Sequence, residues 1–175
     1  MASANYNQNI TDTDTNKKES QDIHSKIYAR FSSTDHIKST KANITKLCFD
    51  EVLSCLCFKL VNNQILLDYR YFKFISAPEN YELLLFYITS IIKDVLLTHN
   101  NFIFHVNMDR LTLLHIEKHY SFIKKIAEVL KTTFPDKLEI CYIYNAPFIF
   151  SKLFSVISAF IDKKTQQKIR LVKDG

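Results

Sequence analysis

The chain has 175 residues, of which 47% are hydrophobic, so it can bury the core of one ordinary domain. Its single glycine is the last residue, which excludes the glycine-rich phosphate loops of most nucleotide-using enzymes. The net charge of +5 is mild and the lysines are spread along the sequence, so we expect no nucleic-acid partner and consider a transient contact with an anionic membrane surface instead.

Residues 1–43 are mostly polar, and we expect them to form a disordered tail ahead of one domain over 44–175. A weak apolar spacing through Ile23, Ile27 and Phe31 could form a short helix within this tail. Two β-favouring runs over 54–61 and 64–71 flank an Asn-Asn pair and predict a hairpin.

Helical and strand-like runs alternate after the hairpin. Helices are predicted from Pro78 to about 98, from Thr112 until Pro135 stops the second, after Pro147, and as a short turn capped by Asp162. Strands are predicted over 102–108, 138–144 and 168–172. This alternation predicts an α/β fold with a mixed, largely parallel sheet flanked by helices.

The cysteines, Cys48, Cys55, Cys57 and Cys141, include no CxxC pair, and no signal-peptide pattern opens the chain. We interpret them as free thiols of a reducing compartment, with Cys141 as inert core. The apolar runs are too short to span a bilayer. A soluble, cytoplasmic protein is therefore expected, with peripheral membrane contact as an option.

The run Phe-Pro-Asp-Lys-Leu-Glu-Ile-Cys-Tyr-Ile-Tyr-Asn-Ala-Pro-Phe-Ile-Phe-Ser, residues 134–151, resembles the signature of the CRAL-TRIO (Sec14-like) lipid-binding family. The following segment 160–172 is similar to the family's Phe-Leu-Asp-x-x-Thr-x-x-Lys-Ile ending. Further upstream, Asn107 and Arg110 stand where the family has Asp and Gly, so the turn after that strand must be built without glycine. About 120 residues share the family pattern in order.

The resemblance implies a protein that encloses, and could transfer, one hydrophobic lipid such as a phospholipid or phosphoinositide, without catalysis or cofactor. The helix after Asn-Ala-Pro would be an aromatic gate over the acyl chains. Its lining residues would be Phe148, Phe150, Leu153, Phe154, Ile157 and Phe160, although the same side chains could simply seal a core. Asp136 and Lys168 would contact the headgroup, and Lys163, Lys164, Arg170 and Lys173 would steer the domain to a membrane.

Two differences between this chain and the family pattern affect the cavity that we expect. The family's preceding helical subdomain is missing or reduced to the tail, and relatives continue beyond the last strand. We therefore expect a compact variant with a shallow or open cavity. The alternative function is a scaffold with a protein partner, linked to small-GTPase regulation or membrane trafficking.

A third and remote alternative is a metal hydrolase centred on His105, His115 and His119, because two histidines four residues apart on a helix can share one metal. Ser151 follows no nucleophile-elbow glycines, and helix capping is its simpler role. The prediction is no enzyme and no metal.

Overall fold

The computed structural model describes residues 21–172 as parts of two units, one ending at Thr34 and one beginning at Asp35. In the first unit, residues 21–32 form a helix, with an ion pair between Lys26 and Asp22 one turn apart. The expected disordered tail over 1–43 therefore contains helix from residue 21 onward, whereas its residues 1–20 lie outside the described part.

The second unit begins with helix α2 (Asp35–Asn43), which was also expected to be disordered. Its acidic first turn and basic last turn both favour a helix, because they oppose the helix dipole. Ile37 is buried in the same hydrophobic core as the sheet and its helices. One buried apolar residue, beside the buried Thr40, gives too weak a periodic signal on this mostly polar helix to be recognised in the sequence.

Helix α3 (Phe49–Leu56) ends inside the run that was predicted to be the first strand. The Glu51 carboxylate accepts a hydrogen bond from the Cys48 amide at 2.8 Å, which caps the helix, and the helix buries Val52, Leu53 and Leu56. Short apolar runs such as 54–61 fit a helix and a strand equally well. Here the capped first turn upstream decides for helix as far as Leu56.

The predicted hairpin is present but shorter, with β1 (Cys57–Lys59) antiparallel to β2 (Gln64–Asp68). Asn62 adopts the left-handed conformation that this tight turn requires (φ 57°). The chain turns into α4 (Tyr69–Ile75) directly after β2, because the Asp68 carboxylate caps that helix by accepting from the Arg70 amide.

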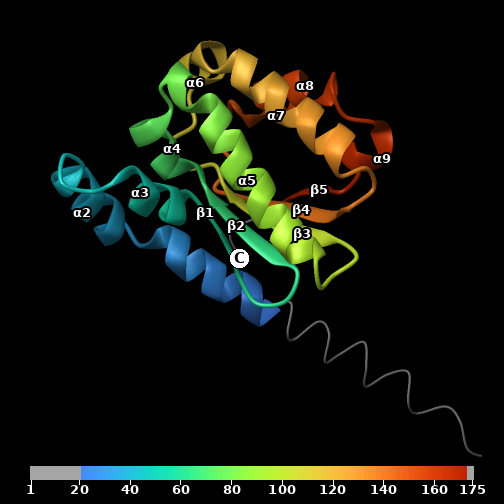
Figure 1. Cartoon of the computed structure of the whole chain (residues 1–175), viewed down its shortest axis with the longest axis horizontal. Helices are drawn as coiled ribbons and strands as arrows, with labels where there is room; N and C mark the ends of the chain where they lie inside the picture. Colours follow the sequence, from blue (N-terminus) through green and yellow to red (C-terminus); the bar gives the residue numbers. More distant parts are fainter. Residues whose placement is uncertain (1–20, 173–175) are drawn as a thin grey trace, which may run out of the picture. The chain divides into compact units, whose positions relative to one another are not determined.

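The five strands lie in the order β1-β2-β3-β4-β5, and all neighbours from β2 onward are parallel. This confirms the predicted largely parallel α/β sheet (Figure 1). The remaining elements are η1 (Pro78–Asn80), α5 (Tyr81–Leu96), β3 (Phe102–Asn107), α6 (Leu113–Lys118), α7 (Tyr120–Thr133), β4 (Leu138–Tyr144), α8 (Phe150–Ser158), α9 (Lys163–Gln166) and β5 (Ile169–Leu171).

Two of the predicted caps are confirmed, since Thr112 accepts from the His115 amide and Asp162 from the Thr165 amide. The capping role predicted for Ser151 is wrong, because α8 begins at Phe150 and its N-cap is Ile149. The long helix after Thr112 is, however, broken into α6 and α7 at His119, whose backbone leaves the helical region (φ −105°, ψ 19°). His119 is buried, and its ring nitrogen Nδ1 lies 2.6 Å from the Tyr81 hydroxyl. The helix is therefore interrupted at the residue whose side chain is buried and contacts Tyr81.

The two faces of the sheet differ in chemistry. Strand register places Ile65, Phe104, Cys141 and Ile169 in one row across β2 to β5, and this row is apolar. The adjacent row, on the opposite face, contains His105, Tyr142 and Arg170. The apolar row faces α5, α7 and α8, which lie over the strands in Figure 1.

Candidate functional site

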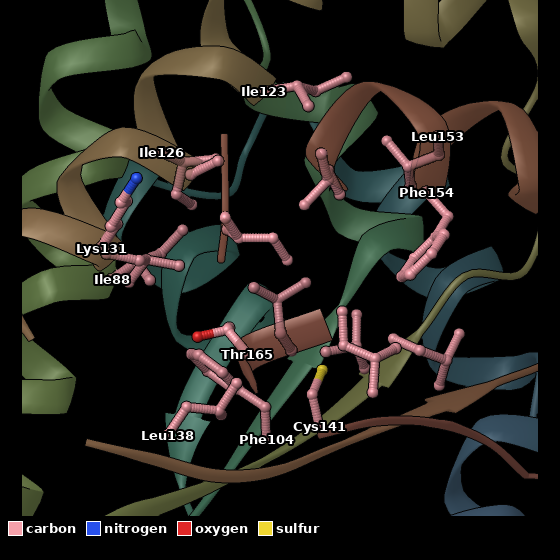
Figure 2. Close-up of a pocket in the computed structure, with 18 of the residues that line it drawn as sticks. Ile88, Phe104, Ile123, Ile126, Lys131, Leu138, Cys141, Leu153, Phe154 and Thr165 are labelled. Atoms are coloured by element: carbon pink, nitrogen blue, oxygen red, sulfur yellow. The ribbon is translucent and has the colours of Figure 1, made fainter. Parts of the chain in front are cut away.

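A cavity of about 610 Å³ lies between the apolar face of the sheet and the helices that cover it. We call it the central cavity; strands β2 to β5 line it on one side and helices α5, α7 and α8 on the other. Figure 2 shows Phe104, Leu138 and Cys141 on the strand side, with side chains of α7 and α8 across from them. The volume is in the range of pockets that enclose small ligands.

Helix α7 contributes one apolar stripe to the cavity. Ile123, Ile126 and Leu130 recur at helical spacing and all line it. The sequence predicted this face as apolar, but periodicity alone does not separate a face that packs on a filled core from one that borders a cavity.

Helix α8 brings four of the six predicted gate residues to the cavity, namely Phe150, Leu153, Phe154 and Ile157. The structure does not place the other two there. Phe148 lies before α8 begins and is fully exposed, and Phe160 lies after α8 ends, with the Lys124 ammonium 5.4 Å from its ring centre. The helix is shorter at both ends than predicted, and these two positions therefore leave the lining face.

The amino end of the parallel strands carries the charged groups of the central cavity. Asp136 and Lys168, predicted from the sequence, both line it, together with Lys131, Asp162, Lys164 and Thr165. Lys164 donates a hydrogen bond to Asp136 at 2.7 Å, and this contact lowers the pKa of the Asp136 carboxyl. Lys168 donates to the Leu138 carbonyl at 2.6 Å. These side chains form a mainly cationic rim, which we call the lysine rim.

The opposite, carboxyl end of the strands carries polar aromatic side chains. Tyr69, His115 and His119 line the cavity here, with the two imidazole rings 6.3 Å apart. Burial raises the pKa of Tyr69 to about 12, and burial is also the main cause that lowers the pKa of His119. The hydroxyl of Tyr69 therefore stays protonated at neutral pH.

A buried polar network also lies at the carboxyl ends of β2, β3 and β4. The Arg70 guanidinium pairs with Asp68 at 2.7 Å, and the Asn107 amide donates to the same carboxylate at 3.0 Å. The side-chain oxygen Oδ1 of Asn107 accepts in turn from the side-chain amide of Asn145 and from the backbone amide of Asp109. The network ties the ends of three strands together and fixes the turns that lead to α4, α6 and α8.

The three histidines of the metal alternative do not meet. His105 lies on the opposite face of the sheet, where it contacts Gln64 and the Tyr144 hydroxyl. Across residues 21–172, no group of three or more His, Cys, Asp or Glu side chains is arranged to hold a metal ion. The arrangement on which the hydrolase alternative depended is therefore not formed.

Comparison with known protein families decides the assignment of the fold. The model of the CRAL/TRIO domain family matches residues 27–175, which is most of the chain. The chain is a CRAL/TRIO domain. This match begins ahead of residue 44, the boundary that the sequence predicted.

Individual relatives of this CRAL/TRIO domain are distant. It is 38% identical over 52 residues to the SEC14 cytosolic factor of Yarrowia lipolytica and 32% identical over 53 residues to the Sec14 cytosolic factor of Schizosaccharomyces pombe. Each match covers 30% of this chain, but only 11% and 18% of the relatives. The crystal structure of Sfh5 has the same fold, with a TM-score of 0.58 and 15% identity over 72% of this chain and 50% of Sfh5.

The described helices of the CRAL/TRIO domain include none long and apolar enough to cross a membrane. Several of its cavity residues were not identified as such from the sequence. Lys131 and Thr165 belong to the lysine rim, and His115 and His119 were considered only as metal ligands. The sequence did contain a signal that Lys131 lies at the edge of the cavity, because this residue directly follows Leu130, the last residue of the apolar stripe of α7.

Proposed function

We propose that this CRAL/TRIO domain binds one lipid molecule in its central cavity and carries it without chemical change. The observation that supports this most is the cavity itself, about 610 Å³ in volume and lined largely by apolar side chains. Each methylene moved from water into such a space is worth about 0.8 kcal/mol, so burial alone can hold an acyl chain. The family resemblance supports the same function.

The lysine rim is the proposed headgroup site. Lys168, Lys164 and Lys131 supply positive charge, and Asp136 supplies a carboxylate that can accept hydroxyl hydrogen bonds. A phosphate on a hydroxylated headgroup, as in a phosphoinositide, matches both kinds of group. We propose that the acyl portion enters past α8, with Leu153 and Phe154 as the apolar side of the gate.

The experiment that tests this function is lipid capture. The purified protein is incubated with mixed liposomes, isolated again, and its bound lipid is identified by mass spectrometry. We expect about one lipid per chain, since one cavity holds one ligand. A folded protein that returns empty would contradict the proposal.

Substitution of Lys168 by Ala tests the headgroup site. We expect Lys168→Ala to lower the preference for phosphatidylinositol over phosphatidylcholine by about tenfold, because a charge-assisted hydrogen bond is lost. Lys163→Ala is the matched control, because it removes the same charge from α9 at a position that does not line the cavity. Equal loss of both lipids in Lys168→Ala would argue against a headgroup role.

The proposed location is the cytoplasm, with transient contact with anionic membranes. Two relatives carry the name cytosolic factor, Lys164 belongs to the lysine rim, and Lys163 precedes it on α9. Arg170, the other charge predicted to steer the domain, lies in the row on the opposite face of the sheet. Lys173, predicted to belong to this group, lies outside the described residues.

A scaffold function remains the second proposal, supported by the outer face of α5. Phe86 of α5 and Leu97, which follows the helix, are 69% and 82% exposed, and both line one shallow depression together with polar side chains of α5. Large exposed apolar side chains beside a depression are the feature of this surface that would suit a protein partner. An empty, folded protein in the lipid-capture experiment would favour the scaffold function. The partner would then be a protein linked to small-GTPase regulation or membrane trafficking.

A further inference from the structure

An exposed ion pair lies at the lysine rim, at the border of the central cavity. Lys164 of α9 donates to the Asp136 carboxylate at 2.7 Å, and this contact lowers the pKa of Asp136 and raises the pKa of Lys164. Both groups are therefore charged at neutral pH. Their side chains remain 67% and 71% exposed, so the pair contributes little to the stability of the fold. Both residues line the cavity, which makes contact with a ligand the better explanation of their position.

The backbone on each side fixes where these two charges meet. Asp136 adopts the left-handed conformation (φ 59°) in the turn between α7 and β4, a conformation that Asp tolerates better than most residues. Lys164 lies in α9, whose first turn is capped by Asp162. The two carboxylate oxygens of Asp162 accept from the amide and the hydroxyl of Thr165, both at 2.9 Å. Asp162 is thus already engaged, and Asp136 is the carboxylate to which Lys164 donates.

Together, Lys164 and Asp136 form a neutral pair that can bind hydroxyl groups. A hydroxyl both donates and accepts hydrogen bonds. Adjacent hydroxyls of a polyol can therefore donate to the carboxylate and accept from the ammonium without separating the two charges. The phosphate of the same headgroup then pairs with Lys168, which in the empty protein contacts the uncharged carbonyl of Leu138.

A cationic headgroup finds the opposite situation at this rim. The trimethylammonium group of choline has no hydrogen to donate, and the charge of Asp136 is already balanced by Lys164. Lys168, which lines the same rim, adds a further positive charge. Like charges placed next to each other disfavour a wrong partner, and this repulsion is a common source of specificity.

We infer that Lys164 is a specificity-determining residue of the lipid site: by pairing with Asp136, it makes the rim accept a phospholipid with a neutral polyol headgroup, such as inositol, and reject one with a cationic headgroup, such as choline. This inference rests on the proposed lipid-binding function and adds the means of discrimination. The two members of the ion pair then act in opposite directions. Loss of Lys164 leaves an unbalanced carboxylate that attracts choline, whereas loss of the Asp136 charge leaves an unbalanced ammonium that repels it.

Vesicles with equal amounts of dioleoyl phosphatidylinositol and dioleoyl phosphatidylcholine test this inference, because the two lipids differ only in their headgroups. The full-length protein is incubated with them and isolated, and the ratio of inositol lipid to choline lipid bound is measured by mass spectrometry. We expect Lys164→Ala to lower this ratio about threefold, the size of effect typical of one exposed charge contact. Lys163→Ala should leave the ratio unchanged, because it removes the same charge from a position that does not line the cavity.

Two further variants separate recognition from structure. Asp136→Asn should raise the ratio about threefold, because Asn still bonds a hydroxyl but no longer balances the charge of Lys164. Lys164→Arg keeps a positive charge beside Asp136 and should keep the wild-type ratio. An ion pair with a purely structural role would shift the ratio in the same direction when either member is lost, and that result would overturn the inference.

Failure of the inference and failure of the proposed function give different results. A wild type that binds lipid, with a ratio that Lys164→Ala and Lys163→Ala change equally, would overturn the inference and leave the lipid-binding function intact. A wild type that prefers the choline lipid would do the same. A wild type that returns from the vesicles without lipid would overturn both.

Discussion

Asn107 shows how a departure from the family pattern can follow from its local partners. The family resemblance places an Asp at this position, but here the residue donates a hydrogen bond to Asp68 and is completely buried. Asp68 is already paired with Arg70, and its carboxylate faces the residue at position 107 directly. An amide can donate to that carboxylate, whereas an ionised Asp cannot.

We therefore expect Asn107→Asp to lower the free energy of unfolding by at least about 2 kcal/mol at neutral pH, since two buried carboxylates would face each other. The deficit should shrink in acid, where the introduced carboxyl group, once protonated, could donate again. Urea unfolding of the wild type and of Asn107→Asp, at neutral pH and in acid, measures this difference in the free energy of unfolding. Wild-type stability at neutral pH would show that the contact with Asp68 contributes little.

Arg110 occupies the family's glycine position and adopts the left-handed conformation, with φ 64°. The turn after β3 is thus built without glycine, as predicted, but with backbone strain of about 1 kcal/mol in a residue that carries a Cβ atom. We expect Arg110→Gly to raise the free energy of unfolding by about 0.5–1 kcal/mol. Arg110→Ala is the control, because it loses the same side chain and keeps the strain; equal stability of the two variants would refute this account.

At the scale of elements, α8 provides an internal comparison. Phe154 lines the cavity, whereas Phe148, just before the helix, is fully exposed. We expect Phe154→Asp to abolish lipid capture from liposomes, because a carboxylate would replace apolar lining. Phe148→Asp should capture lipid normally. Circular dichroism checks that both variants fold, and unchanged capture by a folded Phe154→Asp would show that this face of α8 is not the gate.

The sequence predicted the order of elements well where periodicity and capping agree. The strands near 102–108 and 138–144, the cap at Thr112 and the stop before Pro135 all appear as expected. It failed at α3 and α4, where short apolar runs allow either helix or strand and where contacts of Glu51 and Asp68 decide for helix. Both contacts are local caps, between residues three and two positions apart, so these failures come from cap signals that the apolar pattern outweighed.

The candidate site was predictable only in part, because it also depends on contacts between elements that are far apart in the sequence. The motif after Pro135 identified Asp136 and Lys168, and the structure brings both to the cavity. His115 could not be recognised as a lining residue, because its environment depends on α4 and on the break at His119. Phe148 was included because the motif does not fix where α8 begins.

At the scale of the whole molecule, the buried His119 couples stability to pH. Burial, and secondarily the charges of Lys118 and His115, lower its pKa in the folded state below the ordinary value of 6.5. The unfolded chain therefore binds a proton more readily, and the contribution of His119 to stability is complete above pH 6.5 and is lost as the pH falls toward the folded pKa. Tyr81 and Phe72 contact the His119 ring, and neither offers a negative charge to offset this.

We expect the free energy of unfolding to fall between about pH 7 and about pH 5, and to fall less in His119→Gln, which cannot take up that proton. Urea titrations at the two pH values compare the proteins. Gln can still accept a hydrogen bond from Tyr81, so the comparison isolates the titration. An identical pH dependence in both would place the acid sensitivity elsewhere in the chain.

The central cavity has a mechanical consequence as well. Any part of this space of about 610 Å³ that water does not fill gives the protein without a ligand a larger molar volume than a solid core of the same atoms would have. Hydrostatic pressure favours whichever state has eliminated such voids, and here that is the unfolded chain or a collapsed form with α8 displaced inward. A ligand that occupies the space removes this penalty. Compression should thus destabilise the protein with an empty cavity more than the protein with the cavity filled.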